Sequence, residues 1–333
     1  MPNSRDYAVV VGLNHYKKLP VLNGPINDAR RFGKWLTSPG GGDLPVANCK
    51  VIVSRPNALH PIQDDIDQAL AEIIEAYQGD KFRRFYFFFA GHGIGLKWDV
   101  SGLCMPKWSD IFLNAVLSSK GYLDYIVASD FFEEAYFFLD CCRNRKSNVS
   151  PLPPTLGVVK DRGSCSSLII HATDFENVAG EGLTSNGTDL KITGFFSQAL
   201  SDGLNGAAVN ANGEITIDGL IQYVIPKTEQ LAIAQNMSQR VTYQFNNGGI
   251  DMNTPIVAGK KQLATQLTIT FKKGGVMVLK NPVLEIIKNG YVLPGESWGP
   301  IPLIKGYYSI TSPEKTDFVE IDGVQKTRNY EFG

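Results

Sequence analysis

Residues 85–93, FYFFFAGHG, and residues 135–142, AYFFLDCC, decide the fold of this chain. In both stretches an unbroken apolar run leads directly into reactive side chains. Apolar residues on both alternating faces are typical of a central parallel strand that helices cover on each side. The two stretches therefore predict inner strands of one sheet, each ending in residues capable of chemistry.

Strand and helix patterns alternate on both sides of these two stretches. Strand patterns occupy residues 7–13, 49–54, 82–90, 135–140 and 168–172. Helical spacing of apolar residues occurs at 26–36 and 62–77, more weakly around 129–134, near 193–203, and near 227–239 after a further segment at 214–224. This alternation predicts an α/β unit over residues 1–259, with a mostly parallel sheet flanked by helices.

Beyond residue 259 the pattern changes to short strands separated by Gly, Pro and Asn, as in LTITF and GVMVL. No helix-length pattern remains, so residues 264–333 are predicted to form a small antiparallel β-sandwich. This part contains no His and no Cys. By fold-level analogy with small β units attached to bacterial enzymes, we expect it to bind a regulatory protein partner.

The composition excludes several classes of function. Lys and Arg number 32 against 33 Asp and Glu, so no net field favours nucleic acid or an anionic membrane surface. The apolar part of the N-terminal segment is too short for a signal peptide or a membrane span. The five cysteines lack both a disulfide framework and a CxxC pair. We therefore expect free thiols, no metal site and a soluble protein of the cytoplasm.

The ends of the two central strands carry the candidate chemistry. Reactive groups collect at the carboxyl ends of strands in an open α/β sheet. One strand leads into His92 and the other into Cys142, and the 50 residues between them allow one crossover connection. A thiol of ordinary pKa is mostly protonated at neutral pH, and a neighbouring imidazole can take its proton. Cys142 is therefore the candidate nucleophile and His92 its base.

The glycines around His92 extend this interpretation. The N–H groups of Gly93 and Cys142 are candidate donors to an oxyanion. Cys141 should point to the opposite side of its strand, where it would be packed and inert. The competing interpretation is structural, because buried cysteines are common core residues and a lone histidine at a strand end needs no catalytic role. The joint placement of His92 and Cys142 at two strand ends favours catalysis.

Five blocks of the sequence resemble the caspase and metacaspase domain in order and spacing. They are LNGPINDARRFGKWL, FAGHG, LDCCRNR, FFSQALSDGLNGA and GEITIDGLIQYV, and the resemblance covers residues 5–259. It implies a caspase-like fold and a cysteine endopeptidase whose catalytic dyad falls on His92 and Cys142. Because family members have Asp-x-Cys or Gln-x-Cys in the second motif, Asp140 selects Cys142 rather than Cys141.

The resemblance also implies a substrate class. Caspases hold an acidic P1 side chain with arginines and a glutamine, whereas metacaspases hold a basic P1 residue with acidic groups. Asp28 in the NDA block and Asp140 match the metacaspase residues, and two carboxylates in one pocket favour a cation between them. Protein or peptide substrates with Arg or Lys at P1 are thus implied. The structural alternatives are helix capping by Asp28 and a strand-end role for Asp140.

Three details qualify the resemblance. An ungapped match of LIIHATDFENVAGE places Glu181 where caspases carry an arginine that contacts P1. Arg143 stands where many metacaspases have His, which points to a prokaryotic relative. For such a relative, prokaryotic cell death or defence is the expected context, although the residues do not select between them. We expect no cofactor. Calcium activation, frequent among metacaspases, would need an acidic cluster, and no site can be placed among the aspartates between the dyad members, Asp99, Asp110, Asp124 and Asp130.

Two other classes of function compete with the protease. A caspase-fold pseudoenzyme or adaptor would act by protein binding alone, but such proteins usually lose the His or the Cys. A hydrolase or transferase acting on another acyl group would not need an acidic pocket. A last expectation concerns residues 143–163, where PLPP and the lack of periodicity predict a flexible loop. Tethered beside the active site, this loop would be self-cleaved after Lys160 or Arg162. The alternative is that the loop packs down through its prolines and stays intact.

Overall fold

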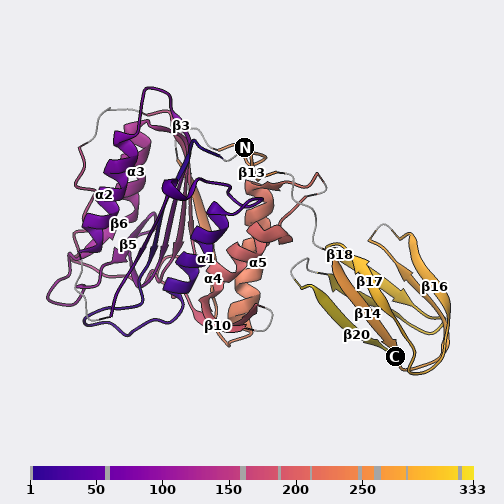
Figure 1. The fold of residues 1–333 in the computed structure, drawn as a ribbon. Coiled ribbons are helices and arrows are strands. Elements are labelled where there is room, and N and C mark those ends of the chain that lie inside the picture. Colours follow the sequence, from indigo (N-terminus) through magenta and orange to yellow (C-terminus); the bar gives the residue numbers. More distant parts are fainter. Residues whose placement is uncertain are drawn as a thin grey trace.

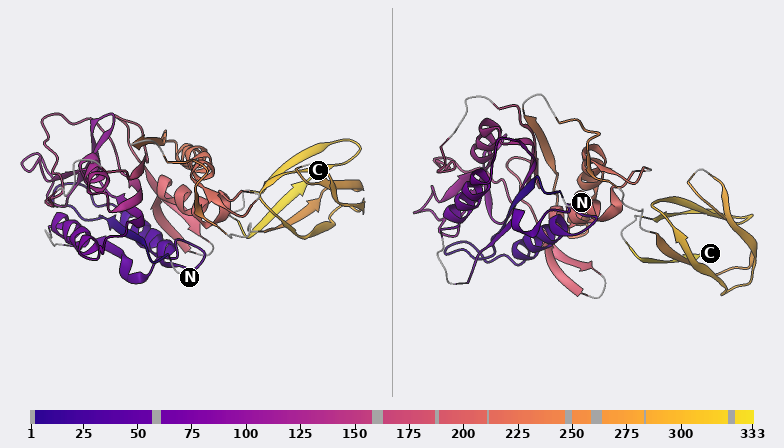
Figure 2. Two further views of the ribbon diagram at one scale, coloured as in Figure 1. Left: turned by 90° about the horizontal axis from the view of Figure 1, so that it is seen from above. Right: turned by 45° about the horizontal axis from the view of Figure 1, so that its top comes forward.

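The fold is described from a computed structural model of the chain. The structure describes residues 3–56, 61–157, 163–186, 189–210, 212–246, 250–258, 264–282, 284–321 and 325–333. Along the chain an α/β unit is followed by an all-β unit (Figure 1). In both views of Figure 2 the all-β unit lies to one side of the α/β unit.

A six-stranded sheet forms the centre of the α/β unit, in the order β12-β8-β7-β3-β1-β2. Its strands are β1 (Asp6–Gly12), β2 (Cys49–Val53), β3 (Phe82–Ala90), β7 (Phe132–Asp140), β8 (Ser166–His171) and β12 (Thr242–Asn246). Neighbouring strands pair in parallel, except that β12 runs antiparallel to β8. The predicted mostly parallel sheet is thus confirmed, with β3 and β7 inside it.

Helices cover both faces of this sheet. In the described part of the chain they are α1 (Pro25–Thr37), α2 (Ile62–Glu75), α3 (Ser119–Ser129), α4 (Phe195–Asp202) and α5 (Ile217–Ile233). One face carries α2 and α3, and the other carries α1, α4 and α5 (Figure 1). None of these helices has the length and apolarity needed to cross a bilayer.

Alternation along β3 explains why both faces are covered. Phe85, Phe87 and Phe89 belong to the buried cluster under α2 and α3, whereas Tyr86 and Phe88 belong to the cluster under α1, α4 and α5. Burial of each such aromatic side chain stabilises the fold by about 1.5–3 kcal/mol. The unbroken apolar run is therefore the sequence signature of a strand with two buried faces.

Three small sheets flank the central one, and the sequence patterns predicted none of them. Their strands are short and interrupted by Gly, Ser and Pro, so they show little periodicity. The first follows His92 directly and the second is a hairpin that leads into α4. They consist of β4 (Gly93–Lys97), β5 (Val100–Cys104) and β6 (Val116–Ser118); of β9 (Glu181–Asn186) and β10 (Asp189–Gly194); and of β11 (Ile215–Thr216) and β13 (Pro255–Val257).

The helix expected around residues 129–134 is wrong. α3 begins after Ser118, whose side chain accepts a hydrogen bond from the Gly121 N–H at 2.9 Å. It ends at Ser129, because Asp130 takes a left-handed conformation with φ 58°. The chain then enters β7 at Phe132. The helix expected near 227–239 is the second half of α5, which ends at residue 233.

The C-terminal unit consists of two sheets packed around a buried cluster of its own. The sheets have the orders β17-β14-β20 and β16-β15-β18-β19. Their strands are β14 (Thr265–Phe271), β15 (Gly275–Lys280), β16 (Ile286–Val292), β17 (Ser297–Leu303), β18 (Gly306–Thr311), β19 (Thr316–Ile321) and β20 (Thr327–Phe332). The pairing is antiparallel as expected, except that β14 and β20 are parallel. The expected boundary at residues 259–263 lies outside the described residues.

Candidate active site

The register of β3 and β7 places the two sequence motifs at one edge of the sheet. Ala90 and Asp140 form the last pair of this parallel ladder. His92 and Cys142 therefore follow at the same carboxyl edge. The two chain segments approach closely, since a Cβ atom on Gly93 would lie 2.7 Å from the Cys142 carbonyl oxygen. Only glycine fits at this position without moving the nucleophile segment.

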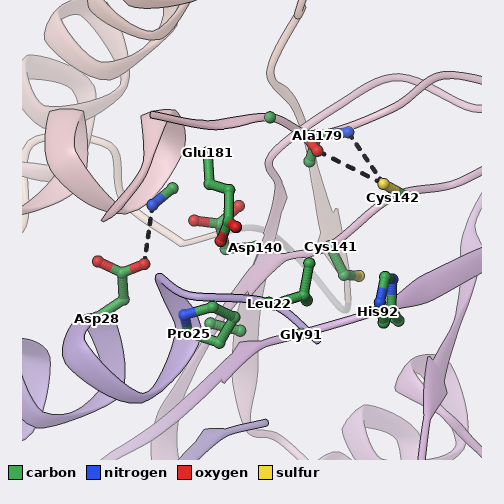
Figure 3. Close-up of a pocket in the computed structure, with 13 residues that line it drawn as sticks. Leu22, Pro25, Asp28, Gly91, His92, Asp140, Cys141, Cys142, Ala179 and Glu181 are labelled. Atoms are coloured by element: carbon green, nitrogen blue, oxygen red, sulfur yellow. Dashed lines mark hydrogen bonds between the residues drawn. The ribbon is translucent and has the colours of Figure 1, made fainter. Parts of the chain in front are cut away.

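A cavity lies beside these residues (Figure 3). Its lining combines thiol groups, an imidazole and three carboxyl groups, supplied by the ends of β3 and β7, the start of α1 and the segment that enters β9. The lining residues are Leu22, Pro25, Asp28, Ala90, Gly91, His92, Asp140, Cys141, Cys142, Ala179, Gly180, Glu181 and Gly194. One cavity thus brings together the candidate side chains His92, Cys142, Asp28, Asp140 and Glu181.

His92 is held in a defined orientation by backbone and ring contacts. Its Nε2 atom lies 2.9 Å from the Pro20 carbonyl oxygen. Because a carbonyl oxygen only accepts, Nε2 carries the proton in a neutral ring, which leaves the Nδ1 lone pair available. The His92 N–H donates to the Tyr16 hydroxyl at 2.8 Å, and the two rings meet edge to face at 4.7 Å. Burial lowers the pKa of His92, which favours the neutral, proton-accepting form.

Cys142 presents a thiol that is partly buried against the segment before β9. Its Sγ atom donates to the Ala179 carbonyl oxygen at 3.5 Å and accepts from the Ala179 N–H at 3.4 Å (Figure 3). Burial raises the pKa of the thiol, and the bond from the Ala179 N–H opposes this shift. The resting group is therefore a thiol that needs a base to become a nucleophile.

The neighbouring Cys141 has a different environment. Its side chain is buried among the core residues between the sheet, α2 and α3. Burial raises its pKa well above the ordinary value of a thiol. Cys141 is thus packed, as expected from the alternation of side chains along the strand.

The Gly93 N–H is directed away from its neighbouring strand. Gly93 pairs with Leu103 in the antiparallel β4–β5 ladder, while the Cys104 N–H donates to the His92 carbonyl oxygen at 3.0 Å. Hydrogen-bonded and non-hydrogen-bonded pairs alternate in such a ladder, so the Gly93–Leu103 pair is the non-hydrogen-bonded kind. This geometry is compatible with the expected donation to an oxyanion.

Asp28 is buried in the first turn of α1, but its carboxylate does not cap that helix. It accepts from the Gly194 N–H at 2.9 Å and forms an ion pair with Arg31 at 2.9 Å. Burial raises the pKa of Asp28 to about 8, with Arg31 opposing and Asp140 adding to the shift. A second cation at this place would stabilise the ionised form.

Asp140 is buried at the end of β7 and accepts two hydrogen bonds from Ser197. The donors are the Ser197 N–H at 3.1 Å and its hydroxyl at 2.5 Å, both in the first turn of α4. Burial raises the pKa of Asp140 to about 6, and the bonds from Ser197 oppose this shift. Asp140 therefore combines a strand-end role, in which it stabilises the start of α4, with a place on the cavity wall.

Glu181, at the start of β9, is the third carboxylate of the cavity. Together with Asp28 and Asp140 it forms the acidic wall. Its carboxylate accepts from the Gly24 N–H at 2.9 Å and from the Asn23 N–H at 3.1 Å. In Figure 3 its side chain lies beside that of Asp140, with Asp28 across the same space. The sequence alignment that suggested Glu181 thus selected a residue of this cavity.

The family follows from a comparison of the whole chain with family models. The model of the caspase domain matches residues 5–262, which is most of the chain. The chain belongs to the caspase domain family. Residues 5–262 are therefore a cysteine-peptidase domain, which confirms the resemblance inferred from the motifs.

Individual proteins similar to this caspase-domain chain include a bacterial relative and a solved structure. A probable protease from a Desulfuromonadales bacterium is 32% identical over 153 residues, which are 42% of this chain and 18% of that protein. The chain thus spans only a small part of that longer relative. The crystal structure of caspase-1 from Spodoptera frugiperda matches with a TM-score of 0.47 and 18% identity, covering 78% of this chain and 92% of that one.

Arg143, the departure from many metacaspases, has a structural position in this caspase domain. Its side chain is 1% exposed. The guanidinium donates to the carbonyl oxygens of Lys97 and Trp98 and lies over the Phe175 ring at 5.8 Å. Arg143 therefore connects the β4–β5 turn to the segment after β8.

The four aspartates considered for calcium do not form a cluster. Three of them pair with lysines, at distances of 3.2, 2.7 and 2.6 Å for Asp110–Lys146, Asp124–Lys120 and Asp130–Lys81. Within the described ranges, no group of three or more His, Cys, Asp or Glu side chains is arranged to hold a metal ion. Asp99 lines a separate pocket.

Sequence reasoning missed the residues that orient the candidate dyad and the carboxylates beside it. Pro20 and Ala179 act through backbone atoms, so their side-chain types gave no signal. Ser197 lies in the FFSQAL block, and its contact with Asp140 arises only when α4 meets the end of β7. Arg31 pairs with Asp28 at i,i+3 spacing within α1, which the NDARRF block already contained. The contacts of Pro20, Ala179 and Ser197 depend on tertiary structure rather than on local pattern.

Proposed function

We propose that this protein is a cysteine endopeptidase that cleaves proteins after Arg or Lys, with Cys142 as nucleophile and His92 as general base. The observation that carries the proposal is the cavity in which both groups share one space with Asp28, Asp140 and Glu181. Three carboxyl groups beside a thiol favour a cationic side chain next to the bond that is attacked.

The reaction follows from the groups at the strand ends. His92 Nδ1 takes the proton of the Cys142 thiol as the sulfur attacks the carbonyl carbon of the scissile bond. The resulting oxyanion accepts hydrogen bonds from the Gly93 and Cys142 N–H groups. The C–N bond then breaks, the imidazolium gives its proton to the leaving amine, and water hydrolyses the thioester. The thiol and the imidazole supply this chemistry without a cofactor.

The acidic wall supports a basic P1 residue. Burial raises the pKa values of Asp28 and Asp140 because no solvent stabilises their charges. A guanidinium or ammonium group between them would restore favourable ionisation, and Arg can bind carboxylates with two parallel hydrogen bonds. An acidic P1 side chain would instead add a like charge to this wall.

A peptide that ends in a P1 arginine bearing a thiol-reactive electrophile tests the assignment directly. We expect a mass increase of one label per chain, located on Cys142 by peptide mapping. The matched reagent with P1 aspartate should not label the chain. Equal labelling by both reagents, or labelling of Cys141 instead, would contradict the proposal.

The rival functions make different predictions in the same experiment. An adaptor that uses the fold only for binding would leave the thiol unlabelled by either peptide. A hydrolase or transferase acting on another acyl group would show no preference for a basic P1 residue. The acidic wall favours the peptidase over both.

The wider context is part of the same proposal. The five cysteines are free thiols, which favours the reducing cytoplasm. The C-terminal unit would bind a regulatory protein through β16, an edge strand on which Ile286 and Tyr291 are 58% and 70% exposed. Exposed apolar edge strands are common sites of strand addition. A role in bacterial cell death or defence would place this regulation upstream of cleavage.

A further inference from the structure

Glu181 connects the acidic cavity to the loop that holds His92. Its carboxylate accepts from the N–H groups of Asn23 and Gly24, at the end of the loop formed by residues 13–24. The same loop presents the Pro20 carbonyl oxygen to His92 Nε2 at 2.9 Å. We propose that Glu181 is a positioning residue that fastens this loop and thereby fixes the orientation of the His92 imidazole.

The hydrogen bonds from Asn23 and Gly24 to Glu181 lie at the start of α1, where a carboxylate is expected to stabilise the helix. Gly24 is the N-cap of this helix and has no side chain, and the Ile26 N–H in the first turn donates instead to Asn14 Oδ1 at 2.9 Å. Glu181, on the β9–β10 hairpin, accepts from the N–H groups of the N-cap and of the residue before it, and its negative charge suits a helix N-terminus. A Cβ atom on Gly24 would lie 3.0 Å from Glu181 Oε2, so glycine permits the close approach.

The other contacts of the loop determine how large the effect should be. The Lys17 N–H donates to the Pro106 carbonyl oxygen at 2.9 Å, and the Leu22 N–H donates to the Asn14 carbonyl oxygen at 3.0 Å. Pro20 lies between these two anchors, so loss of the Glu181 contact would loosen the loop without releasing it. We therefore expect a reduced rate rather than a complete loss of reactivity.

This role differs from contact with a P1 side chain, although one carboxylate could serve both. A carboxylate has about four lone-pair sites, so the two N–H bonds leave room for a substrate cation. The P1 role rests on the proposed function, whereas the positioning role concerns only the thiol, the imidazole and the loop. The two roles separate when the reach and the charge of the side chain are changed one at a time.

Two conservative variants make this separation. Glu181→Asp keeps the charge but withdraws the carboxylate by one methylene from Asn23 and Gly24, whereas Glu181→Gln keeps the reach and one acceptor oxygen but removes the charge. Glu176→Gln is a matched control, because Glu176 is an exposed acid in the segment after β8 whose ion-pair partner is Arg145 at 3.5 Å. Melting temperatures would show that all three variants fold.

The main readout is the alkylation rate of Cys142 by iodoacetamide, which has no P1 side chain. We expect Glu181→Asp to slow alkylation about tenfold, the scale of a partly misplaced general base. Glu181→Gln keeps one acceptor oxygen at the same reach and should slow alkylation less than Glu181→Asp, whereas Glu176→Gln should alkylate at the wild-type rate. A wild-type rate in Glu181→Asp, or an equal loss in Glu176→Gln, would overturn the positioning role.

Peptide cleavage with a P1-Arg substrate supplies the second readout. We expect Glu181→Asp to lower kcat with little change in KM, and Glu181→Gln to raise KM with little change in kcat. If no variant, wild type included, cleaves this substrate while Glu181→Asp still slows alkylation, the proposed function fails and the positioning role stands. If only KM changes in both variants, Glu181 is a substrate contact and not a positioning residue.

Discussion

Asp28 and Asp140 show how single residues are set for a cationic ligand. Both are buried on the wall of the active-site cavity, and desolvation raises their pKa values to about 8 and about 6. Each keeps one backbone N–H donor, from Gly194 and Ser197 respectively, which orients its carboxylate. The charged forms are thus oriented but poorly solvated, and a bound guanidinium would change this balance.

The candidate dyad gives the first prediction. Because the thiol and the imidazole act as a unit, Cys142→Ala and His92→Ala should each lower kcat by about a thousandfold or more. Cys141→Ala should change kcat little, since that thiol is buried in the core. Steady-state peptide cleavage measures the effect, and circular dichroism shows that the fold is kept. Loss of activity in Cys141→Ala but not in Cys142→Ala would contradict the choice of nucleophile.

The acidic wall gives the second prediction. Asp28→Asn and Asp140→Asn should each lower kcat/KM for a P1-Arg peptide. The loss should correspond to about 2–5 kcal/mol of binding free energy in the transition state, the usual cost of removing one partner from a buried charge pair. The control is Asp124→Asn, which removes an exposed carboxylate paired with Lys120 on α3. Unchanged kcat/KM in both wall variants would exclude these residues from P1 binding.

The raised pKa values predict opposite effects of pH on activity and on stability. Substrate binding needs ionised carboxylates, so kcat/KM for P1-Arg should rise as the pH increases from about 6 to about 8. Folding works the other way, because the native state keeps protons on Asp28 that the unfolded chain releases above its ordinary pKa of 3.8. The free energy of unfolding should therefore fall as the pH rises from about 4 to about 8.

Asp28→Asn isolates the contribution to stability. The variant should melt at a higher temperature than the wild type at pH 8 and at a similar temperature at pH 4, where Asp28 is already neutral. Thermal unfolding at the two pH values measures this. A lower melting temperature than wild type at pH 8 would show that Asp28 is stabilised in its charged form.

At the scale of elements, the inner strands of the central sheet could be predicted from sequence, whereas β12, the flanking sheets and the connections could not. β3 and β7 follow from apolar runs with two buried faces, and the candidate dyad follows from the residues after them. The β4–β6 sheet was missed because its strands are short and rich in Gly and Ser. The cavity also depends on loop 13–24 and on Ala179, which reach it only through tertiary packing.

The loop after the nucleophile, residues 143–163, shows how a connection can differ from its sequence pattern. Thr155 donates to Asp67 on α2 at 2.7 Å, and the Leu152 N–H donates to Val116 at 2.8 Å, so its described part is anchored. The candidate cleavage sites Lys160 and Arg162 lie outside the described residues. The chain resumes at Gly163 beside Val127, near the start of β7, whereas Cys142 follows the end of that strand.

This geometry changes the prediction for self-processing. Gly163 and Cys142 thus lie near opposite ends of a nine-residue strand, which spans about 30 Å, whereas three residues of chain reach only about 10 Å. Cleavage at Lys160 or Arg162 should therefore occur between molecules. Its rate should rise with protein concentration, and wild type should cut an added Cys142→Ala chain. A concentration-independent rate measured by intact mass would contradict this.

At the scale of the whole molecule, the candidate active site and the C-terminal unit are separate. Two buried clusters lie on the two faces of the central sheet, and a third lies within the β-sandwich. The candidate catalytic and substrate-binding residues all line one cavity of the caspase domain, and none comes from residues 264–333. Selectivity for the P1 residue should therefore be a property of that cavity alone.

The most direct test of this account is the P1 profile of the intact protein. A fluorogenic peptide library that varies only P1 should be assayed with wild type, with Cys142→Ala as the blank. The account predicts cleavage after Arg and Lys, no cleavage after Asp, and no signal from Cys142→Ala. A preference for P1 Asp or for an uncharged P1 residue, or a signal that survives in Cys142→Ala, would contradict it.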